Sequence, residues 1–496
     1  MLKNKAKIEK FDVPNEVSYV TTSLKKAGFE AYLVGGCVRD LFMGRNPKDW
    51  DVTTNATPEQ IIPLFPKTFY ENKFGTVAVV NEDVSHETLK IIEVTPYRIE
   101  SDYSDSRHPD TIVFAKTIDE DLKRRDFTVN AIAYDPDTGE VLDPFGGVAD
   151  LSRGTLRAVG DPKERFEEDA LRILRAIRFH VELGFIIEPE TEKAIQEVSD
   201  KLSKVSHERI RDEFVRIIMS QKPMDGLLIA NKLGVLRYIV PELESAIGVE
   251  QNQAHAYDVW THLLKTLQHS ADKGYPLHVR LAAIFHDISK PETRRWNDQT
   301  KQWTFYGHEV VGSRVTKKIL SNLKFSRETI DKVVNLVRWH MFFSDTETIT
   351  HSAVRRLVAN VGKESIWDLM NVRICDRIGT GRPKENPYRL RKYKAMIEEV
   401  MQDPVSLNML KINGSKIMEV AGISPGPKLG NILYALFDEV IENPSLNTEE
   451  YLNKRALELS TMSDKELAEL GKKGKEIKEI KEGDRVKEIR GKHHVE

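Results

Sequence analysis

The feature of this sequence that most restricts its fold is a change of periodicity near residue 160. Residues 30–135 contain short β-rich apolar runs separated by glycines, whereas from about residue 160 apolar residues recur at helical spacing. A chain of 496 residues also exceeds what a single hydrophobic core fills, about 250–300 residues, so several domains are expected. The pattern predicts an α+β fold, with a small mixed-sheet head followed by an all-helical body.

Composition restricts where such a chain can work. The formal net charge of -3 gives no global basic field, although binding nucleic acid needs only a local stripe of Lys and Arg. The two cysteines, Cys37 and Cys375, are far apart and indicate a reducing compartment without a disulfide framework. The segment MLKNKAKIEKFDVPNE lacks the apolar run that is expected of a signal peptide, and no run reaches the ~20 apolar residues of a membrane span. We therefore expect a cytoplasmic protein that does not enter a membrane.

The segment LVGGCVRDLFMGRNPKDWDVTT contains the most specific pattern of the head. Asp49 and Asp51 lie two apart on a predicted strand, so both carboxylates should project from one face. Two such charges side by side favour a bound cation, and Mg²⁺ prefers oxygen ligands. The preceding Gly-Gly turn offers backbone N–H groups to phosphates, and Glu93 is a candidate third ligand. A lone D-x-D is usually a surface turn, but this ordered combination predicts metal-dependent phosphoryl transfer.

These residues resemble a known family. GGCVRDLFMG followed by KDWDVTTNATPE is similar to motif A of class II CCA-adding enzymes and bacterial poly(A) polymerases. The resemblance continues through RRDFTVNA, EEDALR and SHERIRDEF and covers roughly the first 220 residues. It implies a polymerase-β-like nucleotidyltransferase head in which Asp49, Asp51 and Glu93 are catalytic. The nucleotide-binding residues that it implies are Gly35, Gly36, Arg39, Arg125, Asp126, Asn130, Glu168, Asp169, Arg172, Arg175 and Arg178.

Asp169 and Arg172 indicate how such an enzyme could choose a base without a template. Their i, i+3 spacing predicts one helical face, where a carboxylate accepts from an exocyclic amine and a guanidinium donates to a ring nitrogen. Cytosine and adenine both match this edge, whereas uracil and guanine have the opposite polarity. The resemblance implies that Glu168 braces Arg172. Taken alone, the spacing also fits an ordinary surface salt bridge.

A second group of possible metal ligands lies in residues 262–376. In LAAIFHDISKP, adjacent His and Asp end a strongly apolar helix, and inward ligands on apolar walls are how helical bundles hold metals. This block resembles an HD-domain phosphohydrolase, which implies a metal-activated water and binding of Mn, Ni, Fe or Mg. The alternative is a degenerate HD fold that serves as a scaffold. The implied metal ligands are His262, His286, Asp287, His308, His340 and Asp376.

We therefore expect four parts: a nucleotidyltransferase head (1–155), a helical neck that reads the nucleotide (156–250), an HD domain (251–385) and a helical C-terminal tRNA-binding body with a charged tail (386–496). The tail is expected to be a solvated helix or a frayed end. The turn at Gly426 and Lys428 fits either an RNA phosphate or ordinary helix packing. The oligomeric state is not given by the sequence.

The expected reaction is template-independent addition of CCA to the 3′ end of tRNA from CTP and ATP, with Mg²⁺ as cofactor. The segment 97–122 resembles the flexible loop of relatives that add the terminal A, although it also fits a polar surface loop. The rival functions are a poly(A) polymerase, an enzyme that adds only part of CCA, a nucleotide-signal hydrolase and an RNA-binding chaperone.

Overall fold

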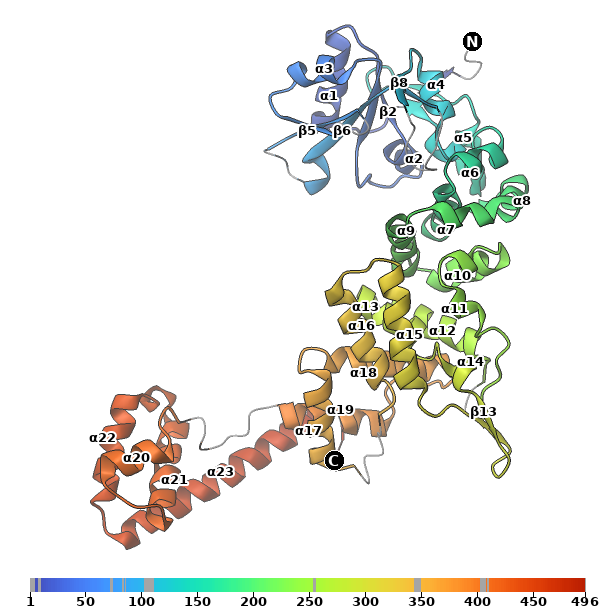
Figure 1. Cartoon of the computed structure of the whole chain (residues 1–496). Helices are drawn as coiled ribbons and strands as arrows, with labels where there is room; N and C mark the ends of the chain where they lie inside the picture. The colour runs from blue at the N-terminus through green and yellow to red at the C-terminus, as the bar shows by residue number, and fades with distance from the viewer. Residues whose placement is uncertain are drawn as a thin grey trace. The chain divides into compact units, whose positions relative to one another are not determined.

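The computed structural model describes the whole chain except residues 1–4, 8–9, 72–74, 83, 85, 102–110, 253–255, 343–348, 402–406, 408–409 and 496. It consists of two compact units (Figure 1). The first comprises Met1–Arg338 and Cys375–Arg382, and the second comprises Trp339–Ile374 and Pro383–Glu496. The expected mixed-sheet head and helical body are confirmed, whereas the four-part division of the chain stays a prediction.

The head is built on an eight-stranded sheet in the order β1-β10-β9-β2-β3-β6-β5-β4. Its strand pairs are antiparallel except for β3 with β6, which run parallel. The strands are β1 (Lys5–Lys7), β2 (Ala31–Val34), β3 (Asp51–Thr54), β4 (Thr68–Glu71), β5 (Thr76–Val80), β6 (Ile91–Pro96), β9 (Ala133–Tyr134) and β10 (Glu140–Leu142).

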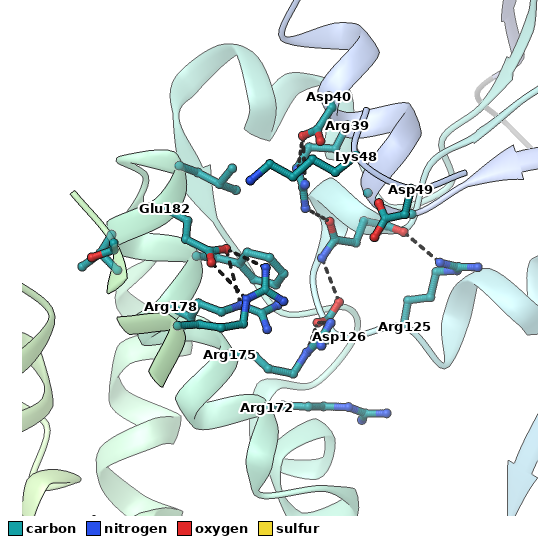
Figure 2. Close-up of a pocket in the computed structure, with 18 of the residues that line it drawn as sticks. Arg39, Asp40, Lys48, Asp49, Arg125, Asp126, Arg172, Arg175, Arg178 and Glu182 are labelled. Carbon is teal, nitrogen blue, oxygen red and sulfur yellow. Dashed lines mark hydrogen bonds and ion pairs between the residues drawn. The ribbon is translucent and has the colours of Figure 1, made fainter. Parts of the chain in front are cut away.

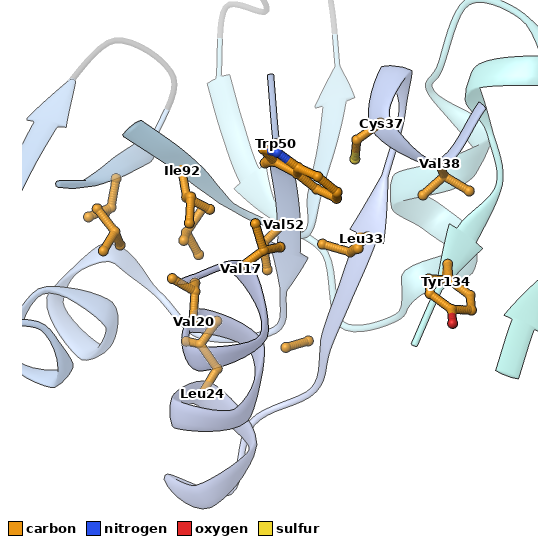
Figure 3. Packing of buried hydrophobic residues seen from close by; sticks show 14 of the residues in the cluster. Val17, Val20, Leu24, Leu33, Cys37, Val38, Trp50, Val52, Ile92 and Tyr134 are labelled. Atoms are coloured by element: carbon orange, nitrogen blue, oxygen red, sulfur yellow. The ribbon is translucent and has the colours of Figure 1, made fainter. Parts of the chain in front are cut away.

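Helix α1 (Asn15–Lys26) covers one face of this sheet with a buried apolar stripe. Val17, Val20 and Leu24 pack against strand residues such as Val52 and Ile92 (Figure 3). Because side chains alternate across a strand, burying Val52 on this face turns its neighbour Asp51 toward the other face. The core therefore fixes where the predicted catalytic carboxylate points.

The helices after the head confirm the helical body, with one difference. In RFEEDALRILRAIRF the structure has two helices, α6 (Pro162–Glu168) and α7 (Leu171–Leu183), where one continuous helix is expected. The other helices of the first unit include α2 (Gly36–Phe42), α4 (Ile118–Lys123), α5 (Gly147–Arg153), α8 (Pro189–Val198), α9 (His207–Met219), α10 (Pro223–Lys232), α12 (Val259–Asp272), α13 (Leu277–Phe285), α15 (His308–Asn322) and α16 (Arg327–Trp339). Short strand pairs β7 (Arg98–Ser101) with β8 (Thr111–Phe114) and β11 (Thr155–Leu156) with β12 (Ile186–Ile187) accompany them.

The second unit is helical among its described residues. Helix α23 (Asp464–Lys492) contains most of the charged tail, and it is packed rather than frayed. A Cβ added at Gly474 would lie 2.1 Å from the carbonyl oxygen of Tyr434, so the backbones of α23 and α21 approach closely. The helices of this unit are α17 (His351–Val361), α19 (Tyr388–Met401), α20 (Gly414–Ala421), α21 (Pro427–Glu442), α22 (Glu449–Ser460), α23 and part of α18 (Ile366–Gly379).

None of the helices in the described part of the chain combines the length and apolarity that crossing a membrane requires. The segment 97–122 is described only in part, because residues 102–110 lie outside the described residues.

Candidate active site

A cleft of about 930 Å³ lies in the first unit, lined by the Gly-Gly turn, the segment before β3, residues 124–130 and helices α7 and α9. In its described lining, ten Lys and Arg side chains accompany six Asp and Glu side chains, so the local charge is positive although the chain is acidic overall. The predicted residues that it brings together are Gly35, Gly36, Arg39, Asp49, Asp51, Arg125, Asp126, Asn130, Asp169, Arg172, Arg175 and Arg178.

The carboxylates lie at the end of β3. Asp51 is the first residue of the strand, and Asp49 lies in the bend before it, so the expectation that both lie on the strand is wrong for Asp49. Both nevertheless line the same cleft. Glu93 is the register partner of Asp51 on the parallel neighbour β6, where it lies outside the cleft lining. The structure thus places three carboxylate residues at one edge of the sheet.

The electrostatics of Asp51 reflect this crowding. Burial raises its pKa to about 7, with further upward contributions from Asp49 and Glu93, while Arg125 lowers it. Carboxylates held this close together are stabilised by a cation between them. The pair therefore has the chemistry of a divalent-metal site made of oxygen ligands.

The Gly-Gly turn packs directly against these carboxylates. Gly35 has φ of +76°, and a Cβ there would lie 3.1 Å from a guanidinium nitrogen of Arg125 and 3.4 Å from Asp51 Oδ2. A Cβ on Gly36 would lie 3.7 Å from Asp49 Oδ1. Only glycine accepts this φ without strain, and it leaves room for a ligand beside the charges.

Residues 125–130 connect the two sides of the cleft. Arg175 Nε donates to Asp126 Oδ2 at 2.8 Å, and Asn130 Nδ2 donates to Asp126 Oδ1 at 3.1 Å. Asn130 Oδ1 in turn accepts from Arg39 at 2.9 Å. Burial opposes ionisation of Asp126, but Arg175 and Asn130 outweigh it and hold its pKa well below the usual range. Figure 2 shows Asp49 and Arg125 on one side of the cleft and Arg175 and Arg178 on the other.

The predicted base-reading pair is arranged differently from the expectation. Asp169 is in an extended conformation between α6 and α7, so Asp169 and Arg172 do not share one helical face. Asp169 Oδ1 accepts from the backbone N–H of Leu171, and such local bonds compete with a continuous helix. Both side chains still line the cleft. Glu168 Oε2 accepts from Arg172 at 2.6 Å, so this carboxylate braces the guanidinium.

Arg209 lines the cleft but was not among the predicted site residues, although its segment SHERIRDEF belongs to the resemblance. On α9, its guanidinium donates to Asp169 Oδ2 at 2.7 Å across 40 residues of chain. Arg178 points instead to the buried Glu213 at 2.8 Å and lies over the ring of Phe179, 4.4 Å from its centroid. Burial lowers the pKa of Arg178 to about 10. No local motif links residues so distant in sequence.

A second cluster lies elsewhere in the first unit. The Nε2 atoms of His262 and His286 are 3.0 Å apart, and Asp376 Oδ1 lies 3.4 Å from the former and 3.6 Å from the latter. All three residues are buried, and their possible ligand atoms lie within 4.8 Å of one another. A Cβ on Gly379 would lie 3.1 Å from His262 Nδ1, so this glycine lets α18, which carries Asp376, approach α12.

Asp287 joins this cluster to His308. Its Oδ2 lies 3.2 Å from His262 Nε2 and 2.6 Å from Lys290 Nζ, and its Oδ1 lies 3.2 Å from His308 Nε2. Burial lowers the pKa of His286, but Asp287 and Asp376 outweigh this and raise it to about 10. His340, the remaining predicted ligand, is buried and belongs to the second unit.

The orientation of two imidazoles suits metal binding. His286 Nδ1 lies 2.9 Å from the carbonyl oxygen of Ala283, and His308 Nδ1 is bonded to that of Phe305. A carbonyl only accepts, so each Nδ1 donates, and Nε2 is the ring nitrogen that could bind a metal once it carries no proton. This is the outer-shell arrangement that usually fixes metal-binding histidines.

Three family models match the chain. Residues 31–157 match the poly A polymerase head domain, residues 184–247 match the probable RNA and SrmB-binding site of polymerase A, and residues 294–456 match the putative domain 2 of tRNA nucleotidyltransferase. The first match contains Asp49, Asp51 and Glu93, so the fold and the site define a nucleotidyltransferase of the polymerase A class.

Curated relatives narrow this class. The chain is 40% identical over 424 residues to the CCA-adding enzyme of Levilactobacillus brevis, covering 85% of this chain and 92% of the relative. It is 41% identical over 256 residues to that of Leuconostoc mesenteroides, where the match covers 50% of this chain and 62% of the relative. The structure is also similar to the solved structure of the Bacillus stearothermophilus CCA-adding enzyme in complex with CTP, with a TM-score of 0.58. The two sequences are 26% identical, and the match covers 90% of this chain and 98% of that chain. The chain belongs to the CCA-adding enzyme family.

Replacing Asp126 with Asn should lower the free energy of unfolding at pH 7 by about 1–3 kcal/mol, because it removes the charge that faces Arg175 while keeping the shape. The folded-state pKa of Asp126 lies below the unfolded value of about 3.9, so its contribution is present above about pH 4 and is lost as pH falls further. Urea unfolding at pH 7, 5 and 3 measures this contribution. The difference between wild type and variant should be smaller at pH 3, and a constant difference would contradict the account.

Proposed function

We propose that this protein adds CCA to the 3′ end of tRNA from CTP and ATP without a nucleic-acid template. The observation that carries the proposal is that one cleft contains both the carboxylates Asp49 and Asp51 and the polar pair Asp169 and Arg172. The first pair suits phosphoryl transfer, and the second suits recognition of a base edge. Membership of the family supports the same reaction.

Magnesium fits the donor set of the head. Asp49 and Asp51 would hold it, with Glu93 beside Asp51 on β6, because these are hard oxygen ligands whose charges repel one another. When bound, the ions would activate the attacking hydroxyl and neutralise charge on the leaving pyrophosphate.

The protein's own residues would position the reactants. In the reaction, the 3′-hydroxyl oxygen of tRNA forms a bond to the α-phosphorus of CTP or ATP, the bond from that phosphorus to the pyrophosphate oxygen breaks, and the hydroxyl proton is released. The turn at Gly35 and Gly36 leaves space for the triphosphate, and Arg39 and Arg125 provide positive charge beside it. Asp126 and Asn130 would hold the ribose.

Base choice would depend on the polarity of Asp169 and Arg172. Glu168 fixes the Arg172 guanidinium, and Arg209 pairs with the Asp169 carboxylate, so both groups are held in place before a nucleotide enters. Uracil or guanine would leave these groups without complementary partners, and hydrogen-bonding sites of this kind can discriminate by roughly 10⁴–10⁵. Arg175 and Arg178 would support the same wall of the cleft.

The alternative is a poly(A) polymerase, or an enzyme that adds only the terminal A. Transcripts of tRNA that end before CCA, after C and after CC, each incubated with CTP and ATP and then sequenced, separate these functions. We expect every transcript to be completed to CCA and extension to stop there. Long A tails would identify a poly(A) polymerase, and extension of the CC-ending transcript alone would identify an A-adding enzyme.

In the same assay, Asp49→Asn and Asp51→Asn should each lower the rate of incorporation roughly 100-fold or more, because metal ions supply several kcal/mol to such reactions. Glu87→Gln is the matched control, since its side chain in the same domain is 89% exposed. Incorporation that survives in both Asp variants would contradict the assignment of these carboxylates.

A second function is favoured by the cluster of His262, His286 and Asp376. We propose that it binds a divalent metal such as Mn, Ni, Fe or Mg and serves as an HD-type phosphohydrolase, because imidazole and carboxylate ligands suit these ions. Asp287 and His308 extend the donor set. The metal would lower the pKa of a bound water for attack on a phosphoester.

For this second site, His286→Ala should weaken binding of Mn²⁺ by at least about 10- to 100-fold, because even outer-shell changes at metal sites have effects of this size. Calorimetric titration of the protein with MnCl₂ measures this change. His207→Ala is the control, since His207 is exposed. Nucleotide addition should be unchanged in both variants. Wild-type protein that binds no metal at this cluster would favour a scaffold role.

A further inference from the structure

The hairpin formed by β13 (Arg295–Asn297) and β14 (Gln302–Thr304) differs from the other strand pairs of the first unit in its surface chemistry. Trp296 and Trp303 are register partners, and their rings meet edge to face with centroids 5.0 Å apart. Among the described residues, the two strands pair only with each other, and β13 projects beyond the neighbouring helices in Figure 1. A two-stranded hairpin is marginally stable alone, and a cross-strand aromatic pair adds to its stability.

The aromatic side chains of the hairpin are nevertheless accessible. Trp296 is 47% exposed, and Tyr306, just after β14, is 83% exposed. The ring of Trp303 is covered by another side chain, because the Arg294 guanidinium lies 3.7 Å from its ring centroid. The hairpin therefore uses Trp303 and Arg294 for its own structure and leaves the other two rings toward solvent.

The charge around these rings is positive. Residues 294–306 contain Arg294, Arg295 and Lys301 and one acidic residue, Asp298, whereas the whole chain has a formal net charge of -3. Lys301 Nζ lies 3.7 Å from Asp298 Oδ1, and the Arg294 guanidinium lies 3.3 Å from Glu250 Oε2. Arg295 is exposed, and the Lys301 side chain is 73% exposed. Exposed aromatic rings can stack on nucleotide bases, and nearby cations can contact phosphates. This combination favours a nucleic acid over a protein as the binding partner.

We propose that this hairpin is an RNA-binding surface that stacks unpaired nucleotides of the substrate on Trp296 and Tyr306, while Arg295 and Lys301 contact their phosphates. The inference rests on the proposed function in one respect, namely that the RNA is tRNA. Paired nucleotides hide their faces inside a helix, so the hairpin selects loop or unpaired end nucleotides. It lies outside the residues that form the catalytic cleft, and so it contributes to affinity rather than chemistry.

The test compares binding of the full-length protein to a fluorescent tRNA transcript by anisotropy at one fixed salt concentration. Trp296→Ala and Tyr306→Ala should each weaken binding by about fivefold or more, as expected for one lost base–aromatic contact. Trp296→Phe should stay close to wild type, because it keeps an aromatic face. Tyr19→Ala, at a 48% exposed aromatic residue of the head, is the control and should bind normally.

Steady-state kinetics separates a binding role from a structural one. Both alanine variants should raise KM for tRNA while leaving kcat and KM for CTP unchanged. Cross-linking of 4-thiouridine-substituted tRNA should label residues 294–306, and the labelled nucleotides should be unpaired. Unchanged tRNA affinity in both variants, labelling confined to paired stems, or a change of oligomeric state in place of RNA affinity would each overturn the inference.

These outcomes are distinguishable from failure of the proposed function. Wild-type protein that adds nucleotides to tRNA, together with hairpin variants that bind tRNA normally, would overturn the inference alone. Wild-type protein that binds tRNA but adds no nucleotide would overturn the proposed function and leave the hairpin measurement interpretable. Wild-type protein that does not bind tRNA would overturn both.

Discussion

The burial of closely placed carboxylates at the start of β3 is the constraint on which the rest of the head depends. Burial is the largest cause of the raised pKa of Asp51, Asp49 and Glu93 raise that pKa further, and Arg125 lowers it. The Gly35 turn keeps this place open, since a side chain there would meet Arg125 or Asp51. The sheet core on the opposite face fixes Asp51 through Val52, its buried neighbour. The sheet core and the glycine turn thus together determine where the charged groups of Asp51 and Arg125 lie in the cleft.

Local patterns were sufficient where local chemistry decides the structure. The strands, the glycine turn and the helix that ends at Phe285, directly before His286, follow from apolar periodicity and turn residues. The helix interruption at Asp169 did not follow, because i, i+3 spacing does not reveal that the Asp169 side chain will bond the backbone of Leu171. Ion pairs such as that of Asp169 with Arg209 could not be predicted from the sequence either, because they depend on how segments far apart in the chain pack. The charged tail showed the same limit, because the sequence does not reveal that Gly471 and Gly474 allow close approach to α21.

The two clusters of titratable residues differ in their charge and in how their side chains contact one another. In the cleft, basic residues outnumber acidic ones in the described lining, which suits a triphosphate that enters and leaves. In the histidine cluster, buried imidazoles and carboxylates face one another directly, which suits a resident ion. Both lie within the first unit, so one compact body contains a candidate transferase site and a candidate hydrolase site, together with the exposed hairpin of the proposed RNA surface.

In the proposed reaction, a protein edge made of Asp169 and Arg172 takes the place of a template base. The most direct measurement is kcat/KM for each of the four nucleoside triphosphates on tRNA lacking CCA, for wild type, Asp169→Ala and Glu182→Gln, a substitution elsewhere in the same cleft. We expect the wild type and Glu182→Gln to prefer CTP and ATP strongly. In Asp169→Ala, the ratio of kcat/KM for CTP and ATP to kcat/KM for UTP and GTP should fall by roughly 100-fold or more. Preference that persists undiminished in Asp169→Ala would contradict it.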